Sequence, residues 1–269
     1  MTRIALAQMV VQASPRENLH LAEQYFDLAA ANNASLIVFP ETFMALSPPT
    51  MPNRHRSDLA EPLSGPFVSQ MKDWARQHHI WAAFGVFERP SEPDPQFRVY
   101  NTVVVIDERG EVAGSYRKTH LYDAFGVQES AMFLAGEHLW SPLDTHFGRL
   151  GLMVCYELRF PEIARFQALH GSEIIIVPSA WYGGALKEFH WQLLVQARAL
   201  ENTLYIVGCN QAENGFIGRS VVCDPLGLTI AQGSEAACFL TADLDLGRIP
   251  NARHRLPCVN QRRPTLYRA

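Results

Sequence analysis

The sequence predicts one domain of the α/β class, with two β-sheets packed face to face and helices outside them. Short apolar runs such as residues 36–39 and 173–177 end at a proline, which is typical of strands buried on both faces. Stretches with apolar residues at helical spacing, such as residues 15–32 and 187–202, separate these runs. No repeat, linker or low-complexity segment interrupts residues 1–269, so we expect a single layered domain.

The first half of the chain alternates between strand and helix patterns. Ser14, followed by Pro15 and then Glu17, predicts a capping box at the start of the first helix. A strand, a helix and a second strand in this order indicate parallel pairing. We expect strands at residues 3–9, 36–39, 80–88, 99–107 and 112–116, helices at 15–32 and 64–79, a polar connection at 48–62, and turns at 91–96 and 108–110.

The second half begins with residues 119–136, whose lack of periodicity predicts a long functional loop. The helix at 187–202 has Leu193, Leu194, Ala197 and Leu200 at positions that predict an inward face. We also expect strands at residues 150–154, 173–177, 204–207, 218–223, 228–231 and 239–244, a helix at 162–169, a turn at 224–227, and an irregular tail at 253–269.

The composition excludes several classes of partner. Hydrophobic residues make up 48% of the chain and charged residues 19%, as in ordinary globular proteins, and the net charge is −4. This balance favours neither a nucleic acid nor an anionic membrane as a partner. No apolar run approaches the roughly 20 residues of a membrane helix. A strand follows Arg3 directly, without a signal-type cleavage pattern, so we expect a cytoplasmic protein.

The five cysteines are an odd number without close pairing, so they predict no disulfide framework. For four of them we expect the role of a small buried hydrophobic residue. The histidines and cysteines lack the spacing of a metal site, and we expect neither a metal nor a cofactor. A role for His78, His79 and His254 as metal ligands at the surface is left open. The four cysteines expected to be small buried hydrophobic residues are Cys209, Cys223, Cys238 and Cys258.

The fifth cysteine, Cys155, ends the apolar run 150–154 just before a turn into a helix, a position that suits a nucleophile. Glu41 follows the run 36–39, and Lys118 follows the run 112–116. If these strands lie side by side in the same direction, the three side chains meet at one edge of the sheets. Each residue alone has a common structural explanation: a buried core thiol, a solvated turn or a surface charge. Their joint occurrence predicts a thiol activated by a base and a cation.

Around these residues the chain resembles the nitrilase superfamily of carbon–nitrogen hydrolases. The resemblance implies a four-layer α-β-β-α sandwich, a Glu41–Lys118–Cys155 triad, and pairing through outer helices into a homodimer or a larger assembly. It also implies that Glu129 orients the lysine or the substrate. The matching segments are Leu36-Ile37-Val38-Phe39-Pro40-Glu41, Tyr116-Arg117-Lys118-Thr119-His120-Leu121, Cys155-Tyr156-Glu157-Leu158-Arg159-Phe160-Pro161-Glu162, Arg198-Ala199-Leu200-Glu201-Asn202 and Asp224-Pro225-Leu226-Gly227.

The implied reaction is amide hydrolysis through a cysteinyl thioester, with a small-molecule amide and water as partners. Glu41 would act as the base, and Lys118 and a backbone N–H after Cys155 would stabilise the oxyanion. Two other classes stay open: an inactive family member that serves as a binding or scaffold protein, and a metal-dependent hydrolase.

The narrower resemblance is to the Nit-type amidase branch, and within it to bacterial deaminated glutathione amidases, on the segments 118–125, 128–130 and 180–191. The ω-amidases of α-ketoglutaramate, the N-carbamoyl amidohydrolases and the nitrilases are the alternatives. Glu157 stands where Asp is commoner, so a displaced ion pair with an arginine is expected. Arg159 is weighed as a structural ion-pair residue or a substrate ligand. The residues expected to bind substrate are Tyr122, Tyr156, Trp181, Lys187 and His190.

Overall fold

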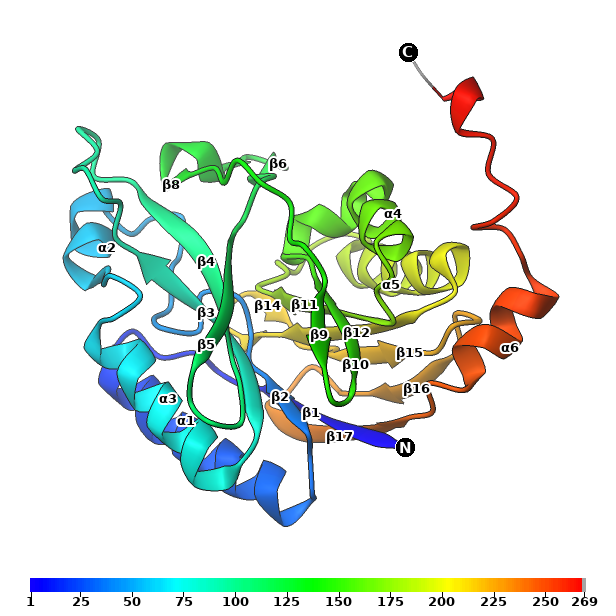
Figure 1. Cartoon of the computed structure of the whole chain (residues 1–269). Coiled ribbons are helices and arrows are strands. Elements are labelled where there is room, and N and C mark those ends of the chain that lie inside the picture. Colours follow the sequence, from blue (N-terminus) through cyan, green and yellow to red (C-terminus); the bar gives the residue numbers. More distant parts are fainter. Residues whose placement is uncertain (268–269) are drawn as a thin grey trace.

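Two β-sheets lie face to face, and helices cover the outer side of each sheet, giving four layers (Figure 1). The structure is a computed structural model, and it describes residues 1–267. The α/β class and the layered sandwich expected from the sequence are confirmed. The first sheet contains, in spatial order, β17 (Cys238–Leu244), β1 (Thr2–Gln8), β2 (Leu36–Val38), β3 (Trp81–Glu88), β4 (Val99–Ile106) and β5 (Val112–Arg117), with β8 (Phe133–Leu134) paired to β4.

The second sheet is built around three parallel strands, β10, β11 and β12. Antiparallel strands complete it on both edges. In spatial order it contains β16 (Thr229–Gln232), β15 (Val221–Cys223), β12 (Tyr205–Asn210), β11 (Ile174–Ser179), β10 (Gly148–Leu152) and β9 (Leu143–Thr145).

Helices α1 and α3 cover the first sheet, while α4 and α5 lie outside the second (Figure 1). The helices are α1 (Pro15–Ala31), α2 (Asn53–Leu59), α3 (Pro66–His78), α4 (Pro161–Leu169), α5 (Lys187–Asn202) and α6 (Arg248–Arg255), with 3₁₀ turns η1 (Glu129–Ala131), η2 (Cys155–Arg159) and η3 (Pro264–Leu266). Four two-residue strands, β6 (Asp123–Ala124), β7 (Val127–Gln128), β13 (Ala212–Glu213) and β14 (Phe216–Ile217), form two small hairpins.

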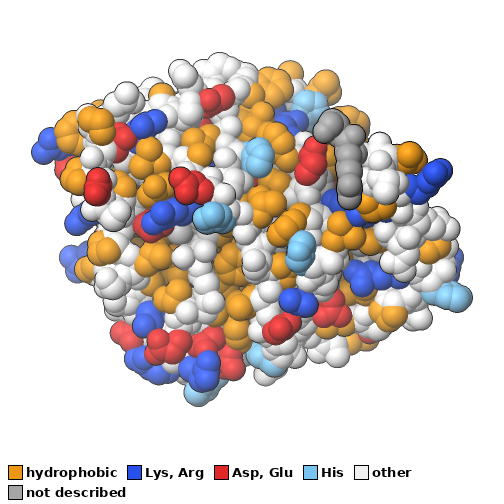
Figure 2. Space-filling view, turned by 45° about the horizontal axis from the view of Figure 1, so that its top comes forward, with side chains coloured by type: hydrophobic (Ala, Val, Ile, Leu, Met, Phe, Trp, Pro, Cys, Tyr) orange, Lys and Arg blue, Asp and Glu red, His pale blue; other side chains and the backbone are white. Residues whose placement is uncertain are grey.

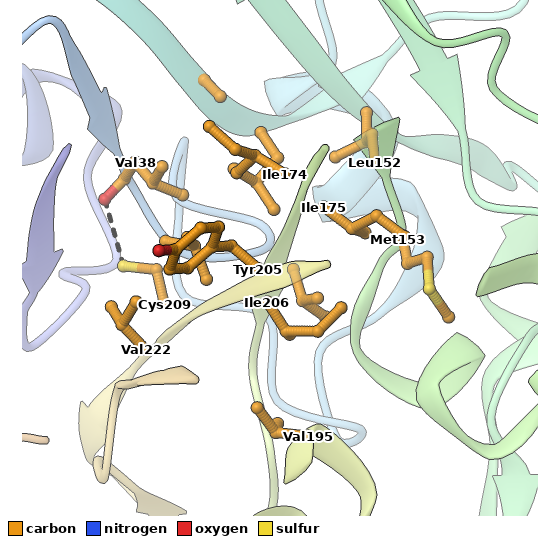
Figure 3. Packing of buried hydrophobic residues seen from close by; sticks show 14 of the residues in the cluster. Val38, Leu152, Met153, Ile174, Ile175, Val195, Tyr205, Ile206, Cys209 and Val222 are labelled. Carbon is orange, nitrogen blue, oxygen red and sulfur yellow. Dashed lines mark hydrogen bonds between the residues drawn. The ribbon is translucent and has the colours of Figure 1, made fainter. Parts of the chain in front are cut away.

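The apolar runs are explained by burial of both faces of each sheet. Leu36 and Val38 of β2 face the core between the sheets, whereas the alternate residues Ile37 and Phe39 pack against the helix layer. The sheets also touch through a polar contact, because the Cys209 thiol donates a hydrogen bond of 3.1 Å to the Val38 carbonyl (Figure 3). Alternation between two cores therefore accounts for strands that are apolar at every position.

Several local expectations were wrong. The connection at 48–62 contains helix α2, and residues 253–255 belong to α6, so the irregular tail begins near Leu256. Ser14 makes no capping hydrogen bond through its side chain, and the Asn18 side chain bonds to the N–H and carbonyl of Gln12. Strand β9 had no sequence signal. Cys209 and Cys223 are buried as expected, but Cys238 and Cys258 are only partly buried.

The inward face of α5 was also predicted wrongly. Leu193 and Leu200 are 50% and 42% exposed. The buried face includes Arg198 and Asn202, whose side chains form hydrogen bonds to the backbone of Leu158 and Arg198. Spacing of apolar residues alone misses a helix face that is buried through polar contacts. An exposed apolar stripe is left on the other side of α5.

On the face seen in Figure 2, acidic and basic side chains are interspersed around scattered hydrophobic ones. No helix among residues 1–267 has the length and apolar content needed to cross a membrane.

Candidate active site

Strand topology brings the three predicted residues together across the sandwich. In the first sheet β2 and β3 are parallel, and β4 is antiparallel to both β3 and β5, so β2, β3 and β5 point the same way. Strand β10, which leads to Cys155, lies in the other sheet. The expectation of three neighbouring strands was therefore wrong in detail. Glu41 and Lys118 come from one sheet, and Cys155 comes from the facing one.

The buried Glu41 carboxylate is held by donors from both sheets. Its Oε1 accepts hydrogen bonds from Lys118 Nζ at 2.8 Å and from Asn101 Nδ2 at 2.8 Å. Its Oε2 accepts the N–H of Ala180, which follows β11 of the second sheet, at 2.9 Å. Gly85 of β3 permits this arrangement, because a Cβ there would lie 2.3 Å from the Thr42 nitrogen. The carboxylate is therefore fixed in orientation.

Lys118 is 2% exposed and lies between two carboxylates. Besides Glu41, its Nζ donates to Glu129 Oε1 at 3.1 Å and Oε2 at 2.8 Å. Burial alone would lower the pKa of the ammonium, but the charges of Glu129 and Glu41 raise it well above its ordinary value. Burial also raises the pKa of Glu129, against the effect of Lys118. The ammonium is therefore a permanent cation within this cluster.

Cys155 occupies a strained turn at the start of η2. Its φ of +45° lies in the left-handed region, which costs a non-glycine residue about 1–3 kcal/mol. This turn resembles the elbow that presents a serine nucleophile in other hydrolases. Burial and the charge of Glu41 raise the pKa of the thiol well above its usual range, while Lys118 opposes this. The resting thiol is therefore protonated, with a carboxylate beside it.

These side chains line one pocket that encloses about 590 Å³ between its walls, its open mouth included. Four of the expected substrate-binding residues, Tyr122, Tyr156, Trp181 and Lys187, line it, whereas His190 does not. The lining residues are Glu41, Thr42, Ser47, Asn101, Lys118, Tyr122, Val127, Glu129, Met132, Phe133, Cys155, Tyr156, Arg159, Ala180, Trp181, Tyr182, Lys187 and Phe216.

Two cations at this pocket have no carboxylate partner among residues 1–267. Lys187 Nζ contacts the Tyr122 hydroxyl at 2.6 Å and lies 3.5 Å from the centre of the Phe125 ring. The Arg159 guanidinium lies 4.9 Å from the centre of the Trp181 ring. Among residues 1–267 neither cation has a carboxylate within 4.0 Å, so the ion pair considered for Arg159 is absent there. Burial, aided by the charge of Arg159, lowers the pKa of Lys187. A bound anion would satisfy both groups.

Sequence reasoning missed Asn101, Tyr182 and the role of Glu157. Asn101 and the adjacent Thr102 are polar residues in the largely apolar strand β4, and this was the available signal. Asn101 donates to both Glu41 and Glu129. The arginine partner expected for Glu157 was wrong, because its carboxylate accepts hydrogen bonds from backbone and hydroxyl groups instead. Tyr182 had no sequence signal of its own.

The described residues contain no group of three or more side chains that could hold a metal ion. A buried thiol, a carboxylate base and a fixed ammonium within one pocket can instead support covalent acyl transfer.

The family model for carbon–nitrogen hydrolases matches residues 3–254. The deaminated glutathione amidase of Escherichia coli O157:H7 is 36% identical over 264 residues, covering 97% of both chains. Among solved structures, a carbon–nitrogen hydrolase from Helicobacter pylori G27 superposes with a TM-score of 0.91 at 26% identity, covering 99% of this chain and 97% of the other. An amidase mutant from Nesterenkonia sp. AN1 has a TM-score of 0.81 at 27% identity, covering 99% and 95%. That structure carries the acetamide moiety of fluoroacetamide on its active-site cysteine.

The chain belongs to the carbon–nitrogen hydrolase family, as the sequence motifs indicated. It is a hydrolase that acts on carbon–nitrogen bonds.

Proposed function

We propose that this protein is a thiol amidase in which Cys155 is the nucleophile, Glu41 the base and Lys118 the oxyanion donor. The observation that carries the proposal is the pocket in which Lys118 Nζ and Glu41 Oε1 lie 2.8 Å apart and which Cys155, with its φ of +45°, also lines. Glu129 holds the ammonium from its other side. We assign it an orienting role.

The reaction has two half-reactions, acylation of the cysteine and hydrolysis of the thioester. Glu41 accepts the thiol proton as the sulfur attacks the amide carbonyl, and Lys118 with the N–H of Tyr156 stabilises the oxyanion, each donor by about 3–4 kcal/mol of barrier. The carbon–nitrogen bond then breaks as Glu41 returns the proton to the departing ammonia, which leaves a thioester. Water attacks the thioester and gives a proton to Glu41, and this proton passes to the sulfur as the acid leaves.

For the substrate we propose a small amide that bears carboxylates, with deaminated glutathione as the preferred one. The relative from Escherichia coli O157:H7 carries that name, and Lys187 and Arg159 offer an acidic substrate two cations that have no carboxylate partner among residues 1–267. Aromatic walls from Tyr122, Tyr156 and Trp181 suit the flat amide and its alkyl chain.

The test compares ammonia release from deaminated glutathione, α-ketoglutaramate, N-carbamoyl amino acids and simple nitriles. We expect the highest kcat/KM for deaminated glutathione. A higher value for α-ketoglutaramate would refute the substrate while keeping the amidase assignment. Release of ammonia from none of the amides would refute the enzymatic proposal and favour a binding role.

We also propose a homodimer formed through the exposed stripe of α5. Leu186, Phe189, Leu193 and Leu200 recur at helical spacing and are 69%, 60%, 50% and 42% exposed. Exposed apolar side chains along one helix face are typical of a contact between proteins. Sedimentation velocity should show a dimer that Leu193→Glu dissociates, whereas Leu28→Glu on α1 should leave it intact. A monomeric wild type would contradict the proposal.

The cytoplasm is the compartment that we propose, because a thiol nucleophile acts only in its reduced form and all five cysteines are free thiols.

A further inference from the structure

The Glu157 carboxylate lies between the two sheets, two residues after the cysteine. Its side chain is 0% exposed. It has no lysine or arginine partner among residues 1–267, and the His120 Nδ1 lies 4.0 Å from its Oε1. A buried carboxylate without a cation requires several hydrogen-bond donors in place of water. These donors lie in the segments that carry Lys118 and Cys155, so they connect Glu157 to both residues.

One oxygen is bound by the segment that carries Lys118. Oε1 of Glu157 accepts the Thr119 N–H at 2.8 Å, the Thr119 hydroxyl at 2.7 Å and the Tyr116 hydroxyl at 2.8 Å, and a longer bond of 3.3 Å comes from the His120 N–H. Tyr116 and Thr119 lie on either side of residues 117 and 118, so four donors fix the backbone on both sides of Lys118 to one oxygen.

The other oxygen is bound by the segment that carries the cysteine. Oε2 accepts the Val154 N–H at 2.8 Å, and the Glu157 N–H donates in return to the Val154 carbonyl at 3.0 Å. These two bonds close the turn around Cys155, whose φ of +45° needs support from its neighbours.

We propose that Glu157 is a positioning residue that sets the distance between the Lys118 ammonium and the Cys155 sulfur. This inference rests on the proposed function. One carboxylate ties the end of β5 in the first sheet to the end of β10 in the second, with no other residue in between. This role requires both carboxylate oxygens, because Oε1 accepts hydrogen bonds from the first sheet and Oε2 from the segment that follows β10 in the second.

The bond pattern distinguishes this role from simple packing. The Lys118 backbone is anchored in its own sheet, since its N–H donates to the Asn101 carbonyl at 2.9 Å. Nothing in that anchor determines where the cysteine of the other sheet lies. Glu41 also joins Lys118 to the second sheet, through the Ala180 N–H, but Glu157 supplies the direct connection to the turn that holds Cys155. Its loss should therefore change how the cation acts on the thiol even in a folded protein.

The test measures two properties of the full-length Glu157→Gln variant. The first is kcat and KM for ammonia release from deaminated glutathione. The second is the pH dependence of Cys155 alkylation by iodoacetamide, followed by mass spectrometry. We expect kcat to fall at least about tenfold with KM within about twofold, because positioning acts on the transition state. We expect the alkylation midpoint to rise, since Lys118 then favours the thiolate less. The other titratable groups that act on the sulfur, Glu41, Lys187, Tyr122 and Tyr182, are unchanged in this variant.

Two further variants serve as a rescue and a control. Glu157→Asp keeps both carboxylate oxygens. It should restore part of kcat and move the Cys155 alkylation midpoint back toward the wild-type value. Asp107→Asn removes a buried carboxylate at the opposite end of the β4–β5 hairpin, which is held there by Arg109 and the Glu111 N–H. It should lower the unfolding temperature without moving the alkylation midpoint.

An unchanged alkylation midpoint in folded Glu157→Gln would overturn the inference and leave Glu157 a stabilising residue. If that variant does not fold, Thr119→Val removes the hydroxyl donor alone, and an unchanged midpoint there would have the same meaning. Failure of the proposed function looks different: the wild type itself would release no ammonia, while the alkylation profiles would still report the coupling.

Discussion

Replacing Lys118 by methionine tests the charge balance of the site. The ammonium makes three hydrogen bonds to the carboxylates of Glu41 and Glu129, at 2.8, 3.1 and 2.8 Å, and all three side chains are buried. Removing one partner of a buried ion pair costs about 3–5 kcal/mol. We therefore expect Lys118→Met to lose about that much free energy of unfolding at pH 8.

The loss should depend on pH in a defined direction. Burial already raises the pKa of Glu129, and removing the cation raises it further. A carboxyl group whose pKa is higher in the folded than in the unfolded protein binds more protons in the folded state. Its destabilising effect is therefore absent below the unfolded pKa and grows as the pH rises through the folded pKa. The deficit of Lys118→Met should therefore shrink at pH 5.

Urea unfolding followed by circular dichroism at the two pH values measures this. Lys72→Met is the matched control, because Lys72 pairs with Glu111 at 3.4 Å on the surface, where such pairs contribute about 0–1 kcal/mol. A deficit under about 1 kcal/mol at pH 8, or an equal deficit at both pH values, would refute the charge balance described here.

Three further predictions follow from the pocket. Glu41→Gln should abolish turnover and yet move the iodoacetamide alkylation midpoint of Cys155 to lower pH, because the Glu41 charge raises the pKa of the thiol; a midpoint that rises would contradict this. Lys187→Met should raise KM for deaminated glutathione at least about tenfold with little change in kcat, since it removes a charge-assisted contact; a neutral amide such as propionamide should be unaffected, and equal effects on both would contradict the role. Prolonged dialysis against EDTA should leave kcat unchanged, and a loss restored by a divalent metal would contradict the thiol mechanism.

Much of the layered fold could be predicted because a strand that is buried on both faces has a recognisable sequence, with apolar residues at consecutive positions. The run Leu36–Val38 is apolar at every position, since alternate residues enter two different cores. The α5 face could not be predicted this way, because Arg198 and Asn202 are buried through hydrogen bonds that depend on tertiary neighbours. Short strands such as β9 likewise depend on their partners.

The site was predictable where a residue follows a strand end and matches a family motif. Cys155, Glu41 and Lys118 met both conditions. The sequence could not indicate that they come from facing sheets, because sheet membership is set by pairing over long distances. The partners of Glu157 Oε1, Tyr116 and Thr119, come from the first sheet and could not be predicted for the same reason, and an arginine was expected in their place.

Ammonia release by Cys155→Ala tests the central claim most directly. The variant removes the sulfur and leaves Glu41, Lys118 and Glu129 in the pocket. With an unfolding temperature close to that of the wild type, it should release no ammonia from deaminated glutathione above the uncatalysed rate. Substantial turnover by the folded variant would contradict the assignment of Cys155 as the nucleophile.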